Sequence, residues 1–85
     1  MTVPIMKLYT RLRCPLCDKA KVILVELQAQ FEFSLIEVDI ETSDDLTEQY
    51  GLMIPVVELD GEMLQFGQVD KRIISKRLQE KLSFL

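Results

Sequence analysis

One stretch of the chain decides its fold: residues 5–17, which read IMKLYTRLRCPLC. Ile5 to Tyr9 is a short apolar and aromatic run that stops at a polar, basic loop, Thr10 to Arg13, as a buried strand does. Pro15 suits the first turn of a helix, because the N–H that it lacks would be unpaired there. The stretch predicts a strand that passes directly into a helix, with two cysteines at the junction.

The periodicity of apolar residues extends this helix from Pro15 to about Gln30. Apolar side chains recur at intervals of three and four residues, at Leu16, Ala20, Ile23, Leu24 and Leu27. Alternation and β-branched residues return from Phe33 to Ile40 and predict a second strand. Because crossovers of this kind are right-handed, the first two strands are expected to be parallel.

Turn and cap residues divide the second half of the chain. Thr42 to Asp45 supplies N-cap chemistry for a short helix, and Gly51 is placed where a helix end favours a left-handed residue. Asp60-Gly61 is a strong hairpin signal between Val56–Leu59 and Glu62–Phe66, since a type I′ turn needs positive φ at both central residues. Two antiparallel strands are therefore expected to join the sheet.

A last helix has one apolar and one basic face. Its apolar stripe consists of Val69, Ile73, Ile74, Leu78 and Leu82. Its opposite face carries Lys71, Arg72, Lys76, Arg77 and Lys81. The chain is predicted to form a single α/β domain over residues 1–85, in the order β-α-β-α-β-β-α with helices covering the sheet.

Composition removes several classes of function. The 85 residues include no His, so triads and metal sites built on imidazole are excluded, and two Cys are too few for a disulfide-stapled scaffold or a closed zinc site. The net charge of −4 argues against nucleic-acid binding. Residues 1–10 lack the features of a secretory signal, and no apolar run reaches membrane-spanning length. We expect a soluble cytoplasmic protein that binds neither nucleic acid nor membrane.

The two cysteines, Cys14 and Cys17, carry the chemical signal. Cys14 is expected at the N-cap, where unpaired N–H groups and the positive end of the helix dipole favour thiolate over thiol. Cys17 lies one turn later, on nearly the same face but directed into the protein, and would be the resolving partner. Four cations surround the pair, and like the helix dipole they favour the thiolate form: Arg11, Arg13, Lys19 and Lys21. The alternative is that these cations only form a solvated surface.

These residues resemble the glutaredoxins of the thioredoxin superfamily. The Cys-Pro-x-Cys motif is matched at Cys14 to Cys17, the basic residue three positions earlier by Arg11, and the cis-proline by Ile54-Pro55. The resemblance implies a minimal thioredoxin fold with sheet order 2-1-3-4 and three helices. A cis proline there would hold Ile54 near the sulfurs, with its N–H and C=O free to pair with an extended substrate. The alternative is an ordinary trans proline entering an edge strand.

Other positions narrow the resemblance. The aromatic residue usual inside the motif is Leu16 here, and Met53-Ile54-Pro55 replaces Thr-Val-Pro. Gly67 and Asp70 retain half of a motif that holds glutathione, although a turn and a helix start would also explain them. Tyr9, Thr10, Leu16 and Asp18 match a short bacterial glutaredoxin-like group. The predicted substrate-binding residues are Arg11, Pro15, Leu16, Ile54, Pro55 and Gly67.

The favoured interpretation is a monomeric thiol–disulfide oxidoreductase. Cys14 would attack a protein or small-molecule disulfide, and Cys17 would release the product while a Cys14–Cys17 disulfide closes. No bound cofactor or metal is expected; glutathione as co-substrate, or a thioredoxin-type reductase, would supply electrons. Two alternatives remain open: a metal or iron–sulfur carrier that uses the same cysteines, and a binding module whose basic last helix docks an acidic partner.

Overall fold

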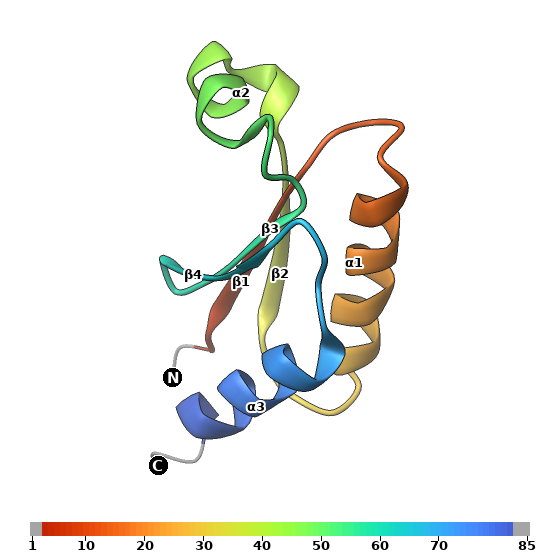
Figure 1. Ribbon diagram of the computed structural model, residues 1–85. Coiled ribbons are helices and arrows are strands. Elements are labelled where there is room, and N and C mark those ends of the chain that lie inside the picture. The colour runs from red at the N-terminus through yellow and green to blue at the C-terminus, as the bar shows by residue number, and fades with distance from the viewer. Residues whose placement is uncertain (1–2, 83–85) are drawn as a thin grey trace.

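A computed structural model describes residues 3–82 and shows an α/β unit (Figure 1). The elements, in chain order, are β1 (Ile5–Thr10), α1 (Pro15–Leu27), β2 (Ser34–Asp39), the 3-10 helix η1 (Ile40–Thr42), α2 (Asp44–Tyr50), β3 (Val56–Leu59), β4 (Glu62–Phe66) and α3 (Lys71–Leu82). Apart from the short η1, this is the order that the sequence predicts. No helix within residues 3–82 has the length and apolar character needed to cross a membrane.

The four strands form one mixed sheet in the order β2-β1-β3-β4. β1 pairs with β2 in parallel, so that Tyr9 lies opposite Val38, and with β3 in antiparallel, so that Tyr9 also lies opposite Val56. Asp60 and Gly61 turn the hairpin between β3 and β4 with φ of 49° and 87°, which confirms the expected positive φ at both positions. The predicted sheet order is confirmed.

The two faces of the sheet are covered unequally. Helices α1 and α3 pack on one face, where Leu24 and Ile74, both 0% exposed, join a core with Met6, Leu8 and Val57. On the opposite face α2 packs only around Tyr9, Val56 and the buried Ile40. Figure 1 shows α2 beyond one end of the sheet, the end at which β1 passes into α1. This end carries the cysteines.

Two helix ends differ from the prediction. The α-helix α1 ends at Leu27 and not at Gln30; the amides of residues 28–30 bond to carbonyls three residues back, so the chain leaves the helix through turns. Gly51 is not left-handed, because its φ of −55° continues the helical conformation. A Cβ at Gly51 would lie 2.5 Å from the Thr47 carbonyl oxygen, so a close backbone approach requires glycine there.

The stripe predicted on the last helix is only partly buried. Ile74 and Leu78 are 0% exposed, whereas Ile73 is 47% exposed and does not belong to the core. The reason is geometric: Ile74 and Leu78 are four residues apart on one face, and Ile73 lies about 100° away from Ile74 around the helix. Only the narrower stripe faces the sheet.

Candidate active site

Cys14 caps the first turn of α1. Its φ of −117° and ψ of 100° are extended, and its Sγ accepts a hydrogen bond from the Cys17 N–H at 3.2 Å. The Cys14 carbonyl accepts the Asp18 N–H at 3.0 Å, so the first helical bond starts at this residue, with Pro15 at the first helical position. The predicted N-cap position of Cys14 is confirmed, and it directs an amide hydrogen at the sulfur.

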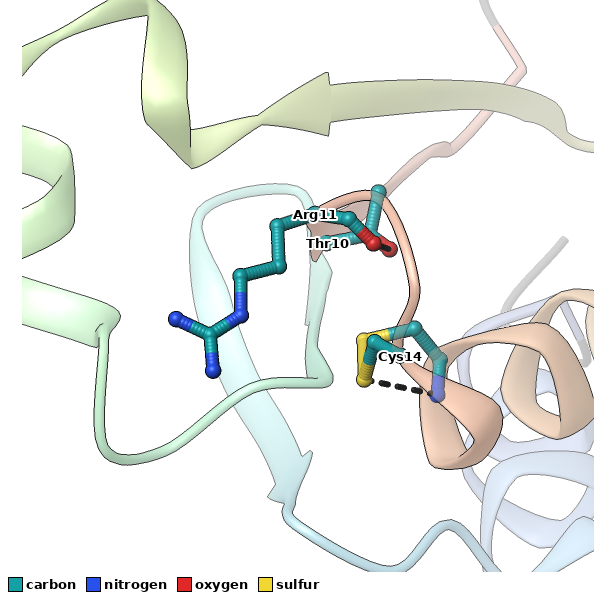
Figure 2. Close-up of a disulfide and its surroundings, with 4 residues drawn as sticks. Thr10, Arg11 and Cys14 are labelled. Carbon is teal, nitrogen blue, oxygen red and sulfur yellow. Dashed lines mark hydrogen bonds between the residues drawn. A yellow bond between two sulfur atoms is a disulfide. The ribbon is translucent and has the colours of Figure 1, made fainter.

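The two sulfurs are joined in a disulfide, and their surroundings differ (Figure 2). The Cα atoms of Cys14 and Cys17 are 5.2 Å apart. Cys17 is 1% exposed, whereas Cys14 is half-buried. An attacking molecule from solvent therefore reaches Cys14 first, and Cys17 reaches only Cys14 without a rearrangement.

The basic residues around the pair fall into two groups. Lys21 forms an ion pair with Glu37 at 2.8 Å, and this hydrogen bond raises the pKa of Lys21. Arg11, Arg13 and Lys19 are exposed and form no ion pair within residues 3–82. Arg13 also has a positive φ of 60°, which turns the loop directly before Cys14. Within residues 3–82, three of the four predicted cations therefore form no ion pair with a carboxylate.

A cavity of about 400 Å³ lies between the β1–α1 loop and β2. Its lining combines the buried Cys17 with three cations and three carboxylates: Leu8, Thr10, Arg11, Leu12, Arg13, Cys17, Asp18, Lys21, Glu37 and Asp39 form the wall. In Figure 2 the Arg11 side chain extends away from the disulfide, toward the segment that joins α2 to β3. The cavity gives Cys17 a polar neighbourhood although the residue is almost fully covered.

The Ile54–Pro55 peptide bond is cis, as the resemblance implies. Because Tyr9, near the end of β1, pairs with Val56, the first residue of β3, the segment that leads into Val56 lies at the cysteine end of the sheet. One part of the prediction is wrong: the Ile54 N–H is not free, since it donates to the Tyr50 carbonyl at 3.1 Å. No backbone N–H within residues 3–82 donates to the Ile54 carbonyl.

Tyr50 contacts both the segment that precedes Pro55 and the ring of Tyr9. Its carbonyl also accepts the Met53 N–H at 2.8 Å, and its ring stacks on Tyr9 with centroids 4.4 Å apart. Burial, and next the Glu58 carboxylate near the hydroxyl, raise the pKa of Tyr9 to about 12, so Tyr9 stays neutral at physiological pH. The ring contact was not predicted from the sequence, because it joins β1 to α2, two elements that are far apart in the chain.

Gly67 and Asp70 have local structural partners. Gly67 has a φ of 75°, and its N–H donates to the carbonyls of Met53 at 2.9 Å and Pro55 at 2.8 Å. The Arg72 guanidinium contacts the Asp70 carboxylate at 3.3 Å, and the Arg72 backbone N–H donates to it at 2.8 Å; these two contacts, in that order, lower the pKa of Asp70. These contacts match the turn and helix-start alternatives; a substrate-binding role for Gly67 stays a prediction.

Apolar side chains at the cysteine end are exposed to a degree that the sequence analysis did not anticipate. Leu16 is 45% exposed, and Pro15 beside it is also exposed, whereas Pro55 is buried. Further exposed apolar residues here are Leu12 at 77%, Leu52 at 105% and Phe66 at 56%. A signal was present, since Leu12 and Leu52 are large apolar residues inside segments that otherwise read as loops.

The basic face of α3 is largely neutralised within the molecule. Lys71 pairs with Glu26 at 3.6 Å, Lys81 with Asp60 at 2.9 Å, and Arg72 and Arg77 contact Asp70 and Glu62. These pairs weaken the alternative in which this helix docks an acidic partner. Residues 3–82 contain no group of three or more Cys, Asp or Glu side chains arranged to hold a metal ion.

Comparison with known proteins agrees with this geometry. The family described as "Glutaredoxin-like domain (DUF836)" matches residues 5–81. An uncharacterized protein of Mycobacterium tuberculosis is 29% identical over 76 residues, which cover 84% of this chain and 78% of the relative.

Solved structures extend the likeness to three dimensions. The protein Ne2328 from Nitrosomonas europaea superposes with a TM-score of 0.78 at 25% identity, over 92% of this chain and 94% of that one. A protein from X. campestris gives 0.72 at 30% identity, over 88% and 96%. A mutant thioredoxin from Halobacterium salinarum, 18% identical, gives 0.71 over 93% and 74%, which shows the fold alone.

The minimal thioredoxin fold is therefore confirmed, and together with the bonded pair Cys14–Cys17 it supports a redox function. Since the family match spans nearly all of the described residues, the chain belongs to the glutaredoxin-like domain (DUF836) family.

Proposed function

We propose that the chain is a thiol–disulfide oxidoreductase in which Cys14 is the nucleophile and Cys17 the resolving cysteine. The observation that carries the proposal is the asymmetry of the pair. Cys14 is half-buried and accepts an amide hydrogen bond at the start of α1, whereas Cys17 is 1% exposed. An amide donor and a helix N-terminus both stabilise sulfur in its charged, nucleophilic form.

The reaction starts from the reduced dithiol. The Cys14 thiolate attacks one sulfur of a substrate disulfide, a mixed disulfide forms at Cys14, and the first substrate thiolate leaves and takes a proton. The Cys17 thiol then loses its proton and attacks the Cys14 sulfur, so that the second substrate thiolate is released. Two electrons pass from the protein to the substrate, and the Cys14–Cys17 disulfide is the oxidised product.

A donor must then reduce that disulfide. We propose glutathione or a thioredoxin-type reductase, working in the reducing environment of the cytoplasm. Coupled assays run in parallel with glutathione plus glutathione reductase, and with thioredoxin reductase, separate the two donors. Oxidation of NADPH in only one of the assays identifies the donor.

Single-turnover reduction of hydroxyethyl disulfide by the dithiothreitol-reduced protein tests the cysteine roles. Cys14→Ser is expected to lose the reaction, because the remaining sulfur is buried. Cys17→Ser is expected to retain the first step and to stop at a mixed disulfide, visible as an added mass on Cys14. A Cys14→Ser protein that reduces the disulfide at the wild-type rate would contradict the assignment.

A further inference from the structure

Two residues other than glycine have a left-handed backbone within residues 3–82: Arg13, with a φ of 60°, and Asp60, with a φ of 49°. This region costs an L-residue free energy, because its Cβ crowds the following carbonyl, whereas glycine avoids that clash. A residue that is held there needs a compensating contact or has a functional reason to be there. The two residues differ in which of these the structure shows.

For Asp60 the compensation lies within the fold. Its carboxylate accepts the Ile5 N–H at 2.7 Å and pairs with Lys81 at 2.9 Å. Together with Gly61 it also forms the hairpin turn between β3 and β4, and aspartate is one of the residues that adopts positive φ most readily. These contacts explain why an aspartate occupies this position.

Arg13 has no such compensation. Its side chain is exposed, and within residues 3–82 it forms neither a hydrogen bond nor an ion pair. The left-handed turn itself directly precedes Cys14 and leads the chain into the extended conformation of that N-cap. Glycine would make the same turn without the clash of a Cβ. The fold therefore explains the backbone conformation at position 13 but not the arginine.

The other three cations near the cysteines are directed or engaged elsewhere. The Arg11 side chain extends away from the disulfide (Figure 2). Lys21 pairs with Glu37 at 2.8 Å. Lys19 lies two positions after Cys17 in α1, which places the two side chains about 200° apart around the helix. None of these three is both close to the cysteines and available to a new negative charge there.

Arg13 lies next to both cysteines. It precedes Cys14 in the chain, and it lines the cavity of about 400 Å³ whose wall includes Cys17. Residues 51–55, which face the cysteines from the α2–β3 segment, contain no charged side chain. The other charged residues of the cavity wall come from the β1–α1 loop, α1 and β2: Arg11, Asp18, Lys21, Glu37 and Asp39. Three cations and three carboxylates thus balance while the cysteines are bonded, and reduction adds a thiolate to this balanced set.

We propose that Arg13 is a positioning residue whose guanidinium stabilises the thiolate of the reduced cysteine pair, and that this charge contact is the reason why an arginine occupies a left-handed position. The inference rests on the proposed function, because it concerns the nucleophile of that reaction. In the disulfide form the sulfurs carry no charge, so the backbone cost at Arg13 is not offset. In the reduced form the cation and the thiolate attract each other, and the nucleophile is ionised at a lower pH.

Three substitutions at this one position separate the charge from the backbone. Arg13→Lys keeps the charge and the Cβ, Arg13→Ala removes the charge alone, and Arg13→Gly removes the charge and the Cβ. Alkylation of Cys14 by iodoacetamide in the reduced protein, followed as a function of pH, reports the effect of the charge. Urea unfolding of the disulfide form reports the effect of the backbone, because no thiolate is present in that form.

The alkylation midpoint is expected to rise by about 0.5 pH units in Arg13→Ala and in Arg13→Gly, because one cation at a surface site changes a pKa by somewhat less than one unit. Arg13→Lys is expected to keep the wild-type midpoint. Lys19→Ala, which removes a cation from the other face of α1, is the matched control and is expected to shift the midpoint by less than half as much. In the disulfide form, Arg13→Gly is expected to unfold at a higher urea concentration than Arg13→Ala.

The possible outcomes separate the inference from the proposed function. If Arg13→Ala keeps the wild-type midpoint, or if Arg13→Lys or Lys19→Ala shifts it as far as Arg13→Ala does, the charge of Arg13 has no special effect on the sulfur and the inference is wrong. If Arg13→Gly is no more stable than Arg13→Ala, position 13 carries no backbone cost, and the inference is wrong as well. If the wild-type midpoint itself is that of a free cysteine, about 8.5, the sulfur is not activated and the proposed function fails.

Discussion

The two ends of the sheet contrast in how their polar groups are satisfied. At the hairpin end, Asp60 accepts the Ile5 N–H at 2.7 Å, donates its own N–H to Ile5 at 2.9 Å and pairs with Lys81 at 2.9 Å. At the cysteine end, Arg11 and Arg13 form no ion pair within residues 3–82, and Cys14 is half-buried. The same three strands, β1, β3 and β4, run between both ends.

This difference separates stability from reactivity. At the hairpin end the polar groups of Ile5, Asp60 and Lys81 pair with one another, so these groups are not available to a partner. The cysteine end leaves cations, apolar side chains and one sulfur accessible, which costs contacts within the chain but provides a site. The first two of the following predictions compare a leucine and a glycine at each end, and the third concerns the hairpin end alone.

The largest expected effect is on a buried leucine near the hairpin end. Leu78 is 0% exposed in α3, so Leu78→Ala is expected to lower the free energy of unfolding by about 2–5 kcal/mol, through lost burial and a cavity. Leu52 at the cysteine end is fully exposed, and Leu52→Ala is expected to change that free energy by no more than about 0.5 kcal/mol. Urea unfolding measures both; equal losses would remove the contrast.

A smaller effect is expected at two left-handed glycines, one at each end. Gly61 and Gly67 have φ of 87° and 75°, and a Cβ on either would meet nothing within 4 Å. Gly61→Ala and Gly67→Ala are therefore each expected to cost about 1–2 kcal/mol, from backbone conformation alone. Thermal unfolding checks the stability, and reduction of hydroxyethyl disulfide is expected to change for Gly67→Ala only. A changed turnover in Gly61→Ala would mean that the two ends are coupled.

The smallest expected effect is the stability that the ionised Asp60 carboxylate contributes and that is lost at low pH. The hydrogen bond from the Ile5 N–H, and next the contact with Lys81, lower the pKa of Asp60 from its usual 3.8. A lowered carboxylate pKa stabilises the fold fully above pH 3.8, and this contribution is lost as the pH falls through the folded-state pKa.

Comparison of Asp60→Asn with the wild type by urea unfolding at pH 7 and at pH 2.5 isolates this contribution. The wild type is expected to be more stable at pH 7, by less than about 1 kcal/mol because the pair is partly solvated, and the difference is expected to shrink at pH 2.5. A difference that grows in acid would contradict the assignment.

Local signals in the sequence predicted much of this structure. The N-cap at Cys14, the hairpin at Asp60-Gly61 and the alternation before Ile40 each act within a few residues, so they are readable without a fold. The cis form of Ile54–Pro55 came from the family resemblance and is also confirmed. The buried position of Cys17 followed from its place one turn after the cap.

The features that the sequence did not predict depend on contacts between distant segments. The engaged N–H of Ile54 and the paired charges of α3 require knowing where α2 ends and which carboxylates face Lys71 and Arg77. The exposure of Ile73 depends on the angle at which α3 packs. None of these quantities is a property of a short window of residues, and each of them bears on what can bind.

The most direct test of the account is the pH dependence of Cys14 alkylation in the reduced protein. Iodoacetamide labelling, followed by peptide mass spectrometry, reports Cys14 and Cys17 separately. A free cysteine has a pKa of about 8.5. We expect the alkylation rate of Cys14 to reach half its maximum at a pH well below that value, and Cys17 to react far more slowly. Equal, slow labelling of both cysteines, with a midpoint at or above that value, would contradict an activated sulfur at the start of α1.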